Sequence, residues 1–356
     1  MGSFLKQAML WLLFLPLVAC QPTPPAQAPQ TIVDVPASAE QGGALSGGVP
    51  VPPLSTPKPR PLEGNEWPEV ALASGQASIN CAADSSSEEG DQALPDLSYA
   101  SVNGALEPCK ASGLVRLRYS GKIAKDFTAL VERVANIAGR LDIEDRILDL
   151  DSSGGHVEDA MKAGDAIGAT RWTIRVRESA ICHSACVLIL AAGDDRRIEG
   201  KVGIHRMIRV DSMATSRAEL SQELREVYSQ MKEYLERNGA SVAVADLMMT
   251  VPNRKLRLLT PEELLEYGLD GPNAVQDDLE RIQLTRKCGE DFVRRKDEFT
   301  RAFDRQCQQP EESPESVDAC GLALRTDYGF PDGKCPIESP LSSHDRQVVT
   351  DSAGTE

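Results

Sequence analysis

The sequence predicts an α/β fold in which parallel strands alternate with crossover helices, followed by a small helical appendix that contains cysteines. Apolar and charged side chains alternate over residues 115–119, which is the period of a half-buried strand. Apolar residues recur at helical spacing over 127–137, and this pattern stops at Gly139. A short apolar strand at 147–150 then leads into a Gly-Gly turn. Because strand and helix keep alternating, we expect a parallel sheet with helices packed on it.

The alternation continues after the Gly-Gly turn. Small and apolar residues line one face of a helix over 157–167, which suits close packing on a sheet. We expect a strand at 173–176, a helix that begins at Ser184, and a strand that ends at His205. A long helix with a charged surface follows over 218–237.

Residues 1–19 have the build of a secretory signal, with one lysine before an apolar run too short to span a membrane as a mature helix. Residues 17–20 are Leu-Val-Ala-Cys, which resembles the lipobox of bacterial lipoproteins and implies that Cys20 carries lipid. Gln21 stands where an aspartate would retain a lipoprotein at the inner membrane. We therefore expect an envelope protein anchored to the outer membrane and facing the periplasm. The alternative is an ordinary signal peptide with a chance cysteine.

The next segment, 20–95, is predicted to be a disordered tether. It is rich in proline, glycine and serine and has no apolar periodicity, so burial cannot offset chain entropy. Proline-rich chain stays semi-extended and can hold a domain away from a bilayer. We expect the α/β domain at 96–276, the helical appendix at 277–336 and a disordered tail at 337–356.

Composition limits the partners. The formal net charge is −16 and basic residues form no cluster, which argues against nucleic acid. No group of cysteines and histidines has zinc spacing, so we expect neither a metal nor a cofactor. Nine cysteines less Cys20 leave eight, and an even number in an exported chain indicates disulfides.

The spacing of these cysteines suggests three groups, although free thiols or a zinc site remain alternatives. Cys81 and Cys109 flank the start of the predicted domain and could pair. Cys182 and Cys186 lie on either side of Ser184 at helical i,i+4 spacing, where a bridge would clamp the turn. The appendix has few large apolar residues, so it should need crosslinks. Its cysteines are Cys288, Cys307, Cys320 and Cys335.

The centre of the chain has the parts of an acyl-transfer site. A serine hydroxyl needs a base to become a nucleophile, and histidine titrates nearest neutral pH. We predict Ser184 as the nucleophile and His205 as its base. The tetrahedral oxyanion needs fixed N–H donors, which a glycine turn and a helix start can supply. Gly155 and Ala185 are the expected donors.

Four motifs connect this site to a known family. The turn Asp-Ser-Ser-Gly-Gly at 151–155 stands where that family has Asn-Ser-Pro-Gly-Gly. Ser184 precedes Leu-Ile-Leu-Ala-Ala-Gly, where the family's nucleophile precedes Leu-Leu-Ala-Ala-Gly. Gly-Ile-His at 203–205 matches Met-Ile-His, and residues 260–269 are similar to Ser-Ala-Pro-Glu-Ala-x-Glu-Tyr-Gly-Leu. Residues 112–276, about half of the chain, thus resemble the Clp protease proteolytic subunit and the wider Clp/crotonase superfamily.

This resemblance implies a spiral of parallel strands and crossover helices, and a serine peptidase site made by Ser184 and His205. It also implies that the helix at 218–237 is the handle through which subunits form a homo-oligomer. One departure matters: the family's catalytic aspartate falls near Leu256, and residues 252–257 contain no carboxylate. Asn253 could orient the histidine, another group could do so, or the site is a dyad. Loss of the aspartate in a serine protease triad lowers turnover by roughly four orders of magnitude.

We therefore expect a lipid-anchored serine hydrolase that acts on peptides or other acyl substrates. The first alternative is a catalytically weak pseudoprotease that serves as an envelope binding or scaffold module, which the missing aspartate favours. The second is a crotonase-type acyl-CoA enzyme, which export argues against because CoA is not expected in the periplasm. The third is a Ser/Lys site in which Lys201 or Lys255 replaces His205.

The lipobox resemblance gives the first testable prediction. Cys20→Ser removes the thiol that would be acylated, so the variant should accumulate as unprocessed precursor without lipid label. Metabolic labelling with a radioactive fatty acid, followed by gel analysis, measures both effects. Normal labelling of the variant would exclude attachment through Cys20.

Overall fold

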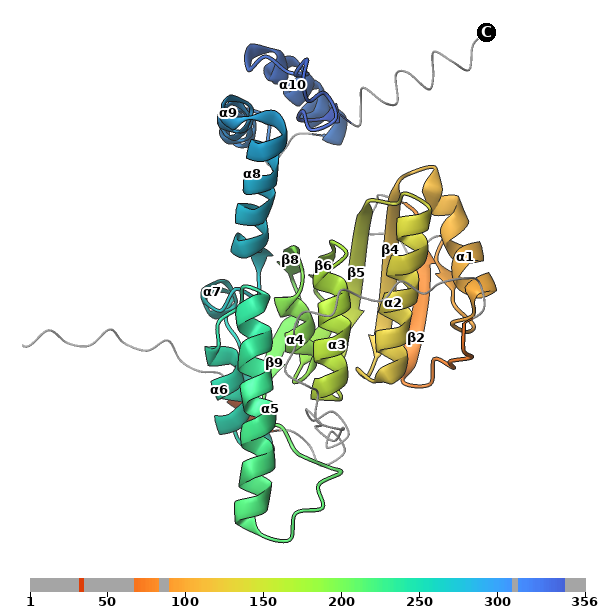
Figure 1. The fold of residues 1–356 in the computed structure, drawn as a ribbon, viewed down its shortest axis with the longest axis vertical. Helices are drawn as coiled ribbons and strands as arrows, with labels where there is room; N and C mark the ends of the chain where they lie inside the picture. Colours follow the sequence, from red (N-terminus) through yellow and green to blue (C-terminus); the bar gives the residue numbers. More distant parts are fainter. Residues whose placement is uncertain (1–31, 35–66, 83–89, 309–312, 343–356) are drawn as a thin grey trace, which may run out of the picture. The chain divides into compact units, whose positions relative to one another are not determined.

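The computed structural model describes residues 32–34, 67–82, 90–308 and 313–342 (Figure 1). The predicted signal peptide, Cys20 and most of the predicted tether lie outside these ranges. The described residues form two separate hydrophobic clusters, one around the main sheet and one in the C-terminal appendix. No helix in the described part is long and apolar enough to cross a membrane.

The larger sheet has seven strands in the order β11-β8-β6-β5-β4-β2-β3. Its central strands β4, β5, β6 and β8 run parallel, and antiparallel strands lie at both edges. The strands are β2 (Gly75–Asn80), β3 (Gln92–Ala93), β4 (Leu114–Gly121), β5 (Asp145–Asp151), β6 (Thr173–Val176), β8 (Asp195–Ile198) and β11 (Gly271–Pro272). The predicted strands at 115–119, 147–150 and 173–176 are confirmed.

A smaller sheet has the order β1-β10-β9-β7. β7 and β9 are parallel, and β10 lies antiparallel to both β9 and β1. The strands are β1 (Ile32–Asp34), β7 (Ile181–His183), β9 (Lys201–Ile204) and β10 (Lys255–Leu258). The predicted Ser184 turn and His205 both follow strands of this sheet, so it positions the candidate site.

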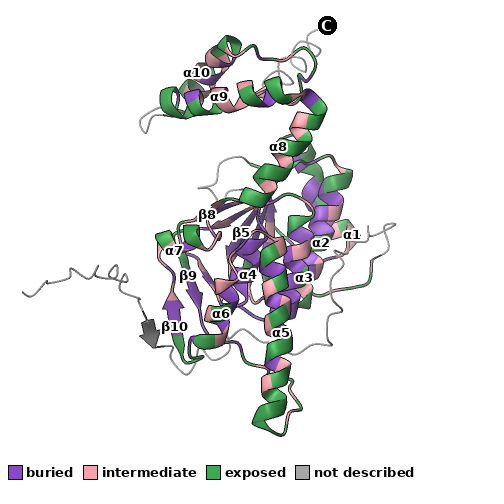
Figure 2. Cartoon of the chain, turned by 60° about the vertical axis from the view of Figure 1, so that its left-hand side comes forward, coloured by how far each residue is buried: buried purple, intermediate pink, exposed green. Residues whose placement is uncertain are grey.

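Helices α2 and α3 cross over between successive parallel strands and pack against the main sheet (Figure 1). Their inward faces carry the apolar residues that the periodicity predicted, and these are buried (Figure 2). Gly164 of α3 faces α5, since an added Cβ would lie 1.8 Å from the Tyr234 hydroxyl. The helices of this domain are α1 (Tyr99–Leu106), the 3₁₀ turn η2 (Glu107–Lys110), α2 (Lys125–Arg140), α3 (Val157–Gly168), α4 (Cys186–Ala191), α5 (Arg217–Arg237), α6 (Ala243–Thr250) and α7 (Pro261–Glu266).

The ordered domain begins earlier than we predicted. We placed residues 20–95 in the tether, but β2 pairs along its whole length with β4 and is part of the main sheet. Ala77 and Ile79 of β2 are buried, with 6% and 1% of their surface exposed. Trp67 packs against the same core, and the Arg133 guanidinium lies 5.2 Å from the centre of its ring. β2 has too few apolar residues for its sequence to predict a strand, and its pairing with β4 is what identifies it as one.

The appendix consists of α8 (Ala274–Cys288), α9 (Glu290–Gln306) and α10 (Pro314–Asp327). Its small core contains Phe292, Phe299 and Phe330. The predicted crosslinking of the appendix is confirmed, and the structure gives the connectivity that the sequence left open: Cys288 pairs with Cys335, and Cys307 with Cys320. Cys81 and Cys109 also pair, joining the segment after β2 to η2.

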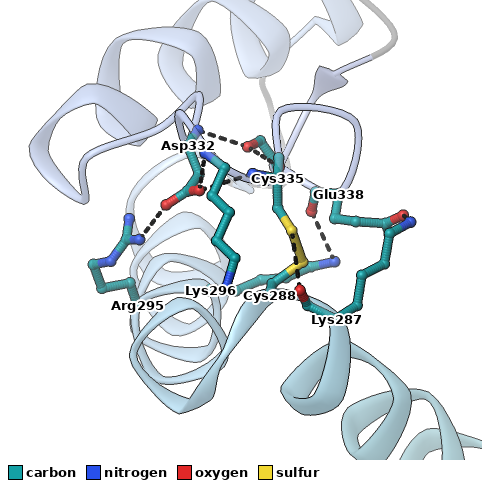
Figure 3. The surroundings of a disulfide bond; sticks show 9 residues. Lys287, Cys288, Arg295, Lys296, Asp332, Cys335 and Glu338 are labelled. Atoms are coloured by element: carbon teal, nitrogen blue, oxygen red, sulfur yellow. Dashed lines mark hydrogen bonds and ion pairs between the residues drawn. A yellow bond between two sulfur atoms is a disulfide. The ribbon is translucent and has the colours of Figure 1, made fainter.

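Polar contacts reinforce the Cys288–Cys335 bridge (Figure 3). The Lys287 ammonium pairs with Glu338 at 2.6 Å, and the Arg295 guanidinium pairs with Asp332 at 2.5 Å. Ser339 is 4% exposed and accepts a hydrogen bond from the Asp332 N–H. The predicted tail at 337–356 therefore begins too early, because residues 337–342 belong to the packed appendix.

The short helix α4 depends on side chains from other elements. All six of its residues are buried (Figure 2), so its last carbonyls have no water to bind. The Arg196 side chain of β8, 1% exposed, donates to the Leu190 and Ala191 carbonyls at 3.0 and 2.9 Å. The Tyr234 hydroxyl of α5 donates to the Leu188 carbonyl at 2.7 Å. A cation at this helix end is also favoured by the helix dipole.

Replacing Arg196 should therefore destabilise the protein. Arg196→Met keeps most of the volume but leaves the buried Ala191 carbonyl without a donor and the Leu190 carbonyl with only the Gly193 N–H, and we expect a loss of about 1–3 kcal/mol in the free energy of unfolding. Urea titration measures it. The matched control is Arg197→Met, because Arg197 is exposed and pairs only with Asp195 of the same strand; that change should stay within about 0.5 kcal/mol. Equal losses in the two variants would contradict the capping role.

Candidate functional site

Ser184 lies in the turn between β7 and α4. We expected a helix that begins at Ser184, but the helix begins at Cys186, because Ser184 has a φ of +61° and so leaves the right-handed helical range. The Ser184 N–H donates to the Gly203 carbonyl of β9 at 2.8 Å, and the Ser184 carbonyl accepts from the Val187 N–H at 3.1 Å. A left-handed conformation costs free energy at a residue with a side chain. The surrounding contacts must therefore hold this turn.

The Ser184 side chain is completely buried, and its hydroxyl has no hydrogen-bond partner in the described part of the chain. A buried hydroxyl without a partner costs roughly 1–3 kcal/mol. A serine at a strained corner between a strand and a helix is also how α/β-hydrolases present their nucleophile. Two unfavourable features thus fall on the same residue, which indicates a functional reason for keeping serine there.

A disulfide closes the chain around Ser184. Cys182 of β7 and Cys186 of α4 are bonded, with their Cα atoms 5.3 Å apart. The predicted pairing is confirmed, but the two residues do not share a helix face, since one lies in a strand and the other at the first position of α4. The crosslink limits how far β7 and α4 can separate. It is therefore a clamp on the turn that carries Ser184.

The Gly-Gly turn is attached to β7 by backbone hydrogen bonds. The Ser152 N–H donates to the Ile181 carbonyl at 2.7 Å, and the His183 N–H donates to the Ser152 carbonyl at 2.9 Å. The Ser152 hydroxyl also accepts the Gly154 N–H at 3.1 Å. Gly154 has a φ of +104°, which a residue with a side chain rarely adopts. Ser152 therefore shapes the turn and connects it to the strand that precedes Ser184.

The backbone on the other side of the turn fixes the direction of the Gly155 N–H. The Ile123 N–H donates to the Gly154 carbonyl at 2.9 Å, and the Ile123 carbonyl accepts the His156 N–H at 2.8 Å. Ile123 and Gly155 thus form a parallel bridge, in which Ile123 bonds to the residues on either side of Gly155. The N–H of Gly155 itself therefore points away from Ile123. Only glycine fits at 155, because an added Cβ would lie 2.0 Å from the Ile123 carbonyl oxygen.

Neither predicted oxyanion donor has an acceptor within the described residues: no hydrogen bond there uses the N–H of Gly155 or of Ala185. Ala185 is the residue before α4, so its N–H is one of the donors that a helix start leaves without an intrahelical partner. Both N–H groups thus lack an acceptor in the described structure. Their role as an oxyanion hole stays a prediction.

His205 directly follows β9 and is 7% exposed. Its Nδ1 lies 3.0 Å from the Arg206 carbonyl oxygen. In the tautomer that donates this hydrogen bond, Nε2 carries a free lone pair, which is the form a general base needs. The backbone after the ring is fixed to the end of α6, since the Met207 N–H donates to the Met248 carbonyl at 2.9 Å.

Ser184 and His205 follow neighbouring parallel strands, and the Ser184 N–H is bonded to Gly203, two residues before His205. The structure has no hydrogen bond between the Ser184 hydroxyl and the imidazole. Catalytic hydrogen bonds are often long in unliganded enzymes and shorten when substrate binds. The pairing of Ser184 with His205 therefore stays a prediction, supported by the adjacency of their strands.

No carboxylate lies within ion-pair distance of His205 among the residues the structure describes. Asn253 makes no hydrogen bond to the ring either, because it lies in an exposed turn before β10 begins at Lys255. The Arg206 carbonyl, rather than Asn253, is the hydrogen-bond partner of the His205 ring. Lys201 and Lys255 are both exposed. The Ser/Lys alternative therefore has no buried lysine at either of the positions it named. The described part also holds no cluster of three or more His, Cys, Asp or Glu side chains suited to a metal.

His183 neighbours the candidate site, although the sequence analysis assigned it no role there. Its Nε2 is buried without a hydrogen-bond partner. Burial lowers the pKa of the His183 imidazole to about 4, and the nearby His205 adds to this lowering while Asp151 opposes it. The ring has room because position 203 is glycine: an added Cβ there would lie 3.1 Å from His183 Cδ2. His183 is therefore a neutral ring beside the candidate base.

The pairing of β7 with β9 was the signal that would have identified His183. His183 pairs with Gly203, and side chains two residues apart on a strand share a face, so His183 and His205 lie diagonally across the two strands. The sequence shows both histidines but not this register. Ser152 was likewise passed over, since its contacts with Gly154 and β7 are tertiary.

No protein-family model matches this chain, and no curated protein matches it. Among solved structures it is similar to the 1510-N membrane-bound stomatin-specific protease in two mutant forms. One is a serine-to-alanine mutant, with 20% identity, a TM-score of 0.36, and coverage of 46% of this chain and 81% of that chain. The other, a lysine-to-alanine mutant in complex with a substrate peptide, has 21% identity, a TM-score of 0.35, and coverage of 43% and 71%. Likeness at this level assigns no residue role, so the proposal below rests on the chain's own geometry.

The lowered pKa of His183 predicts a loss of stability in acid. The folded pKa of about 4 lies below the ordinary value of 6.5. As the pH falls through this interval, the unfolded chain binds a proton that the folded chain does not, so the free energy of unfolding decreases. His183→Gln should lack this component. Urea titrations at pH 7.5, 6.5, 5.5 and 4.5 should show the wild type losing more stability than the variant; parallel losses would refute the assignment.

Proposed function

We propose that this protein is a lipid-anchored serine hydrolase of the cell envelope, and that its substrates are peptides. The observation that carries the proposal is Ser184, a buried serine with an unpartnered hydroxyl at a left-handed turn between a strand and a helix. The resemblance of the surrounding motifs to the Clp protease subunit supports the same function.

The proposed reaction uses four groups. Ser184 Oγ attacks the carbonyl carbon of the scissile bond while His205 Nε2 takes the hydroxyl proton. The N–H groups of Gly155 and Ala185 stabilise the oxyanion of the tetrahedral intermediate. The protonated His205 then gives its proton to the leaving amine, which breaks the bond and leaves an acyl-enzyme. A water molecule, deprotonated by His205, attacks this ester; the ester bond breaks, the proton returns to Ser184 Oγ, and the acid leaves.

Two observations favour slow turnover and keep the pseudoprotease as the second candidate. Ser184 is closed off from solvent, so a peptide carbonyl does not reach its hydroxyl in this conformation. His205 is held by a neutral carbonyl rather than by a carboxylate, so no buried anion stabilises the imidazolium. A pseudoprotease of this fold would use the same site as an envelope binding module.

The anchor and the assembly are further parts of the proposal. Lipid on Cys20 would place the domain at the outer membrane, facing the periplasm. The four disulfides are compatible with an oxidising compartment of this kind. The first turns of α5 are largely exposed, and we propose this helix as the contact in a homo-oligomer.

Activity-based labelling tests the hydrolase proposal. The full-length chain should react with a fluorophosphonate probe, and Ser184→Ala should abolish the reaction because the attacking oxygen is gone. His205→Gln should slow labelling by about 10²–10⁴-fold, which is the usual contribution of a general base. Gel fluorescence over time measures these rates.

The control is heat-denatured wild type, which should not react. Equal labelling of Ser184→Ala would show that another serine is modified. A folded wild type that fails to react would reject the hydrolase and leave the binding module.

A further inference from the structure

A cavity of about 700 Å³ begins beside the Gly-Gly turn. His156 lines it directly after Gly155, and Ala124 lines it directly after Ile123, the residue that bridges to Gly155. The remaining walls come from the first turns of α2 and α3, from residues 70–74, and from Asp211 before α5. The cavity therefore adjoins the Gly-Gly turn through the residues that follow Gly155 and Ile123.

The cavity is lined by a mostly buried side chain whose carboxylate no cation contacts directly. Asp159 of α3 is 6% exposed. In the described part of the chain its carboxylate makes no hydrogen bond and no ion pair within 4.0 Å. Burial raises the pKa of Asp159, and more distant charges on His156, Lys162 and Lys125 partly oppose this. Both lysines are exposed.

The usual structural explanation for a carboxylate at this position does not apply. Asp159 is the third residue of α3, where an acidic side chain commonly accepts the N–H of the residue before the helix. That donor, the His156 N–H, is already bound to the Ile123 carbonyl. The helix start therefore makes a negative charge tolerable at Asp159 but leaves it without a partner.

The other carboxylates of the cavity differ from Asp159. Asp126 accepts the N–H groups of Ala73 and Ser74 at 2.8 and 2.7 Å. Glu158 lies 3.6 Å from the Arg209 guanidinium. Asp211 is exposed at the rim, where water solvates it. Asp159 is thus a buried charge for which a ligand cation would be the first direct partner.

We propose that this cavity binds a lysine or arginine side chain of the peptide near the scissile bond, with Asp159 as its counterion. The inference rests on the proposed function and names its substrate class. An acidic side chain would be repelled by the carboxylates of the lining, and an apolar one would leave Asp159 buried without a partner. The aliphatic stem of a lysine can lie along the cavity while its ammonium reaches the carboxylate.

Peptide binding tests the inference without requiring turnover. The full-length Ser184→Ala chain is titrated against two fluorescein-labelled alanine peptides that differ only in one central lysine or norleucine. Fluorescence anisotropy should show the lysine peptide binding roughly 10- to 100-fold more tightly, as for a hydrogen bond to a charged group. Because Asp159 must be ionised, this preference should be larger at pH 8 than at pH 5.

Adding Asp159→Asn should remove the preference for lysine. Asp211→Asn makes the same charge change at the exposed rim and should alter the preference by less than about threefold. If Asp159→Asn does not fold, the pH dependence in the parent chain decides. Equal binding of both peptides, no binding of either, or equal effects of the two variants would overturn the inference. Fluorophosphonate labelling of the wild type, measured in parallel, shows separately whether Ser184 is a nucleophile.

Discussion

The left-handed turn at Ser184 is the constraint on which the rest of this domain depends. A φ of +61° at a serine is unfavourable, and contacts from three directions hold it. β9 accepts the Ser184 N–H, the Cys182–Cys186 bridge joins the two ends of the turn, and Ser152 ties the Gly-Gly turn to β7. Beneath the turn, Arg196 and Tyr234 donate to the buried Leu188, Leu190 and Ala191 carbonyls of α4. The parallel sheet and its helices therefore serve to fix one strained residue.

The buried carbonyls of α4 have hydrogen-bond donors, whereas several buried polar side chains near Ser184 have no hydrogen-bond partner in the described structure. The carbonyls of α4 have donors from β8 and α5, which is the rule for buried backbone. The Ser184 hydroxyl and the His183 Nε2 are buried without a hydrogen bond in the described structure, and the Asp159 side chain, which is 6% exposed, makes no hydrogen bond or ion pair there. All three belong to the segments that surround the Gly-Gly turn. A site prepared for a ligand has this property, since its polar groups find partners only when the ligand arrives.

The alternation in β4 was predicted with the correct period but with the wrong environment for its charged face. We took residues 115–119 as a half-buried strand, yet Arg116 and Arg118 are 0% and 7% exposed. Arg118 pairs with Asp91 at 2.7 Å and lies 3.4 Å from Asp149 of the neighbouring strand. Period two shows which side chains share a face. It does not show that the segment before β3 supplies a counterion.

The sequence by itself determined the central parallel strands and the helices between them, the position of Ser184 between two cysteines, and the glycines at 154 and 155, because these depend on local periodicity and on backbone conformations that few residues adopt. The tertiary structure alone decided what those residues contact. It placed β2 in the sheet, put His183 beside His205, gave the His205 ring a carbonyl instead of Asn253, and left Asp159 without a partner. These outcomes depend on strand register and on the packing of segments far apart in the chain, which local pattern does not encode.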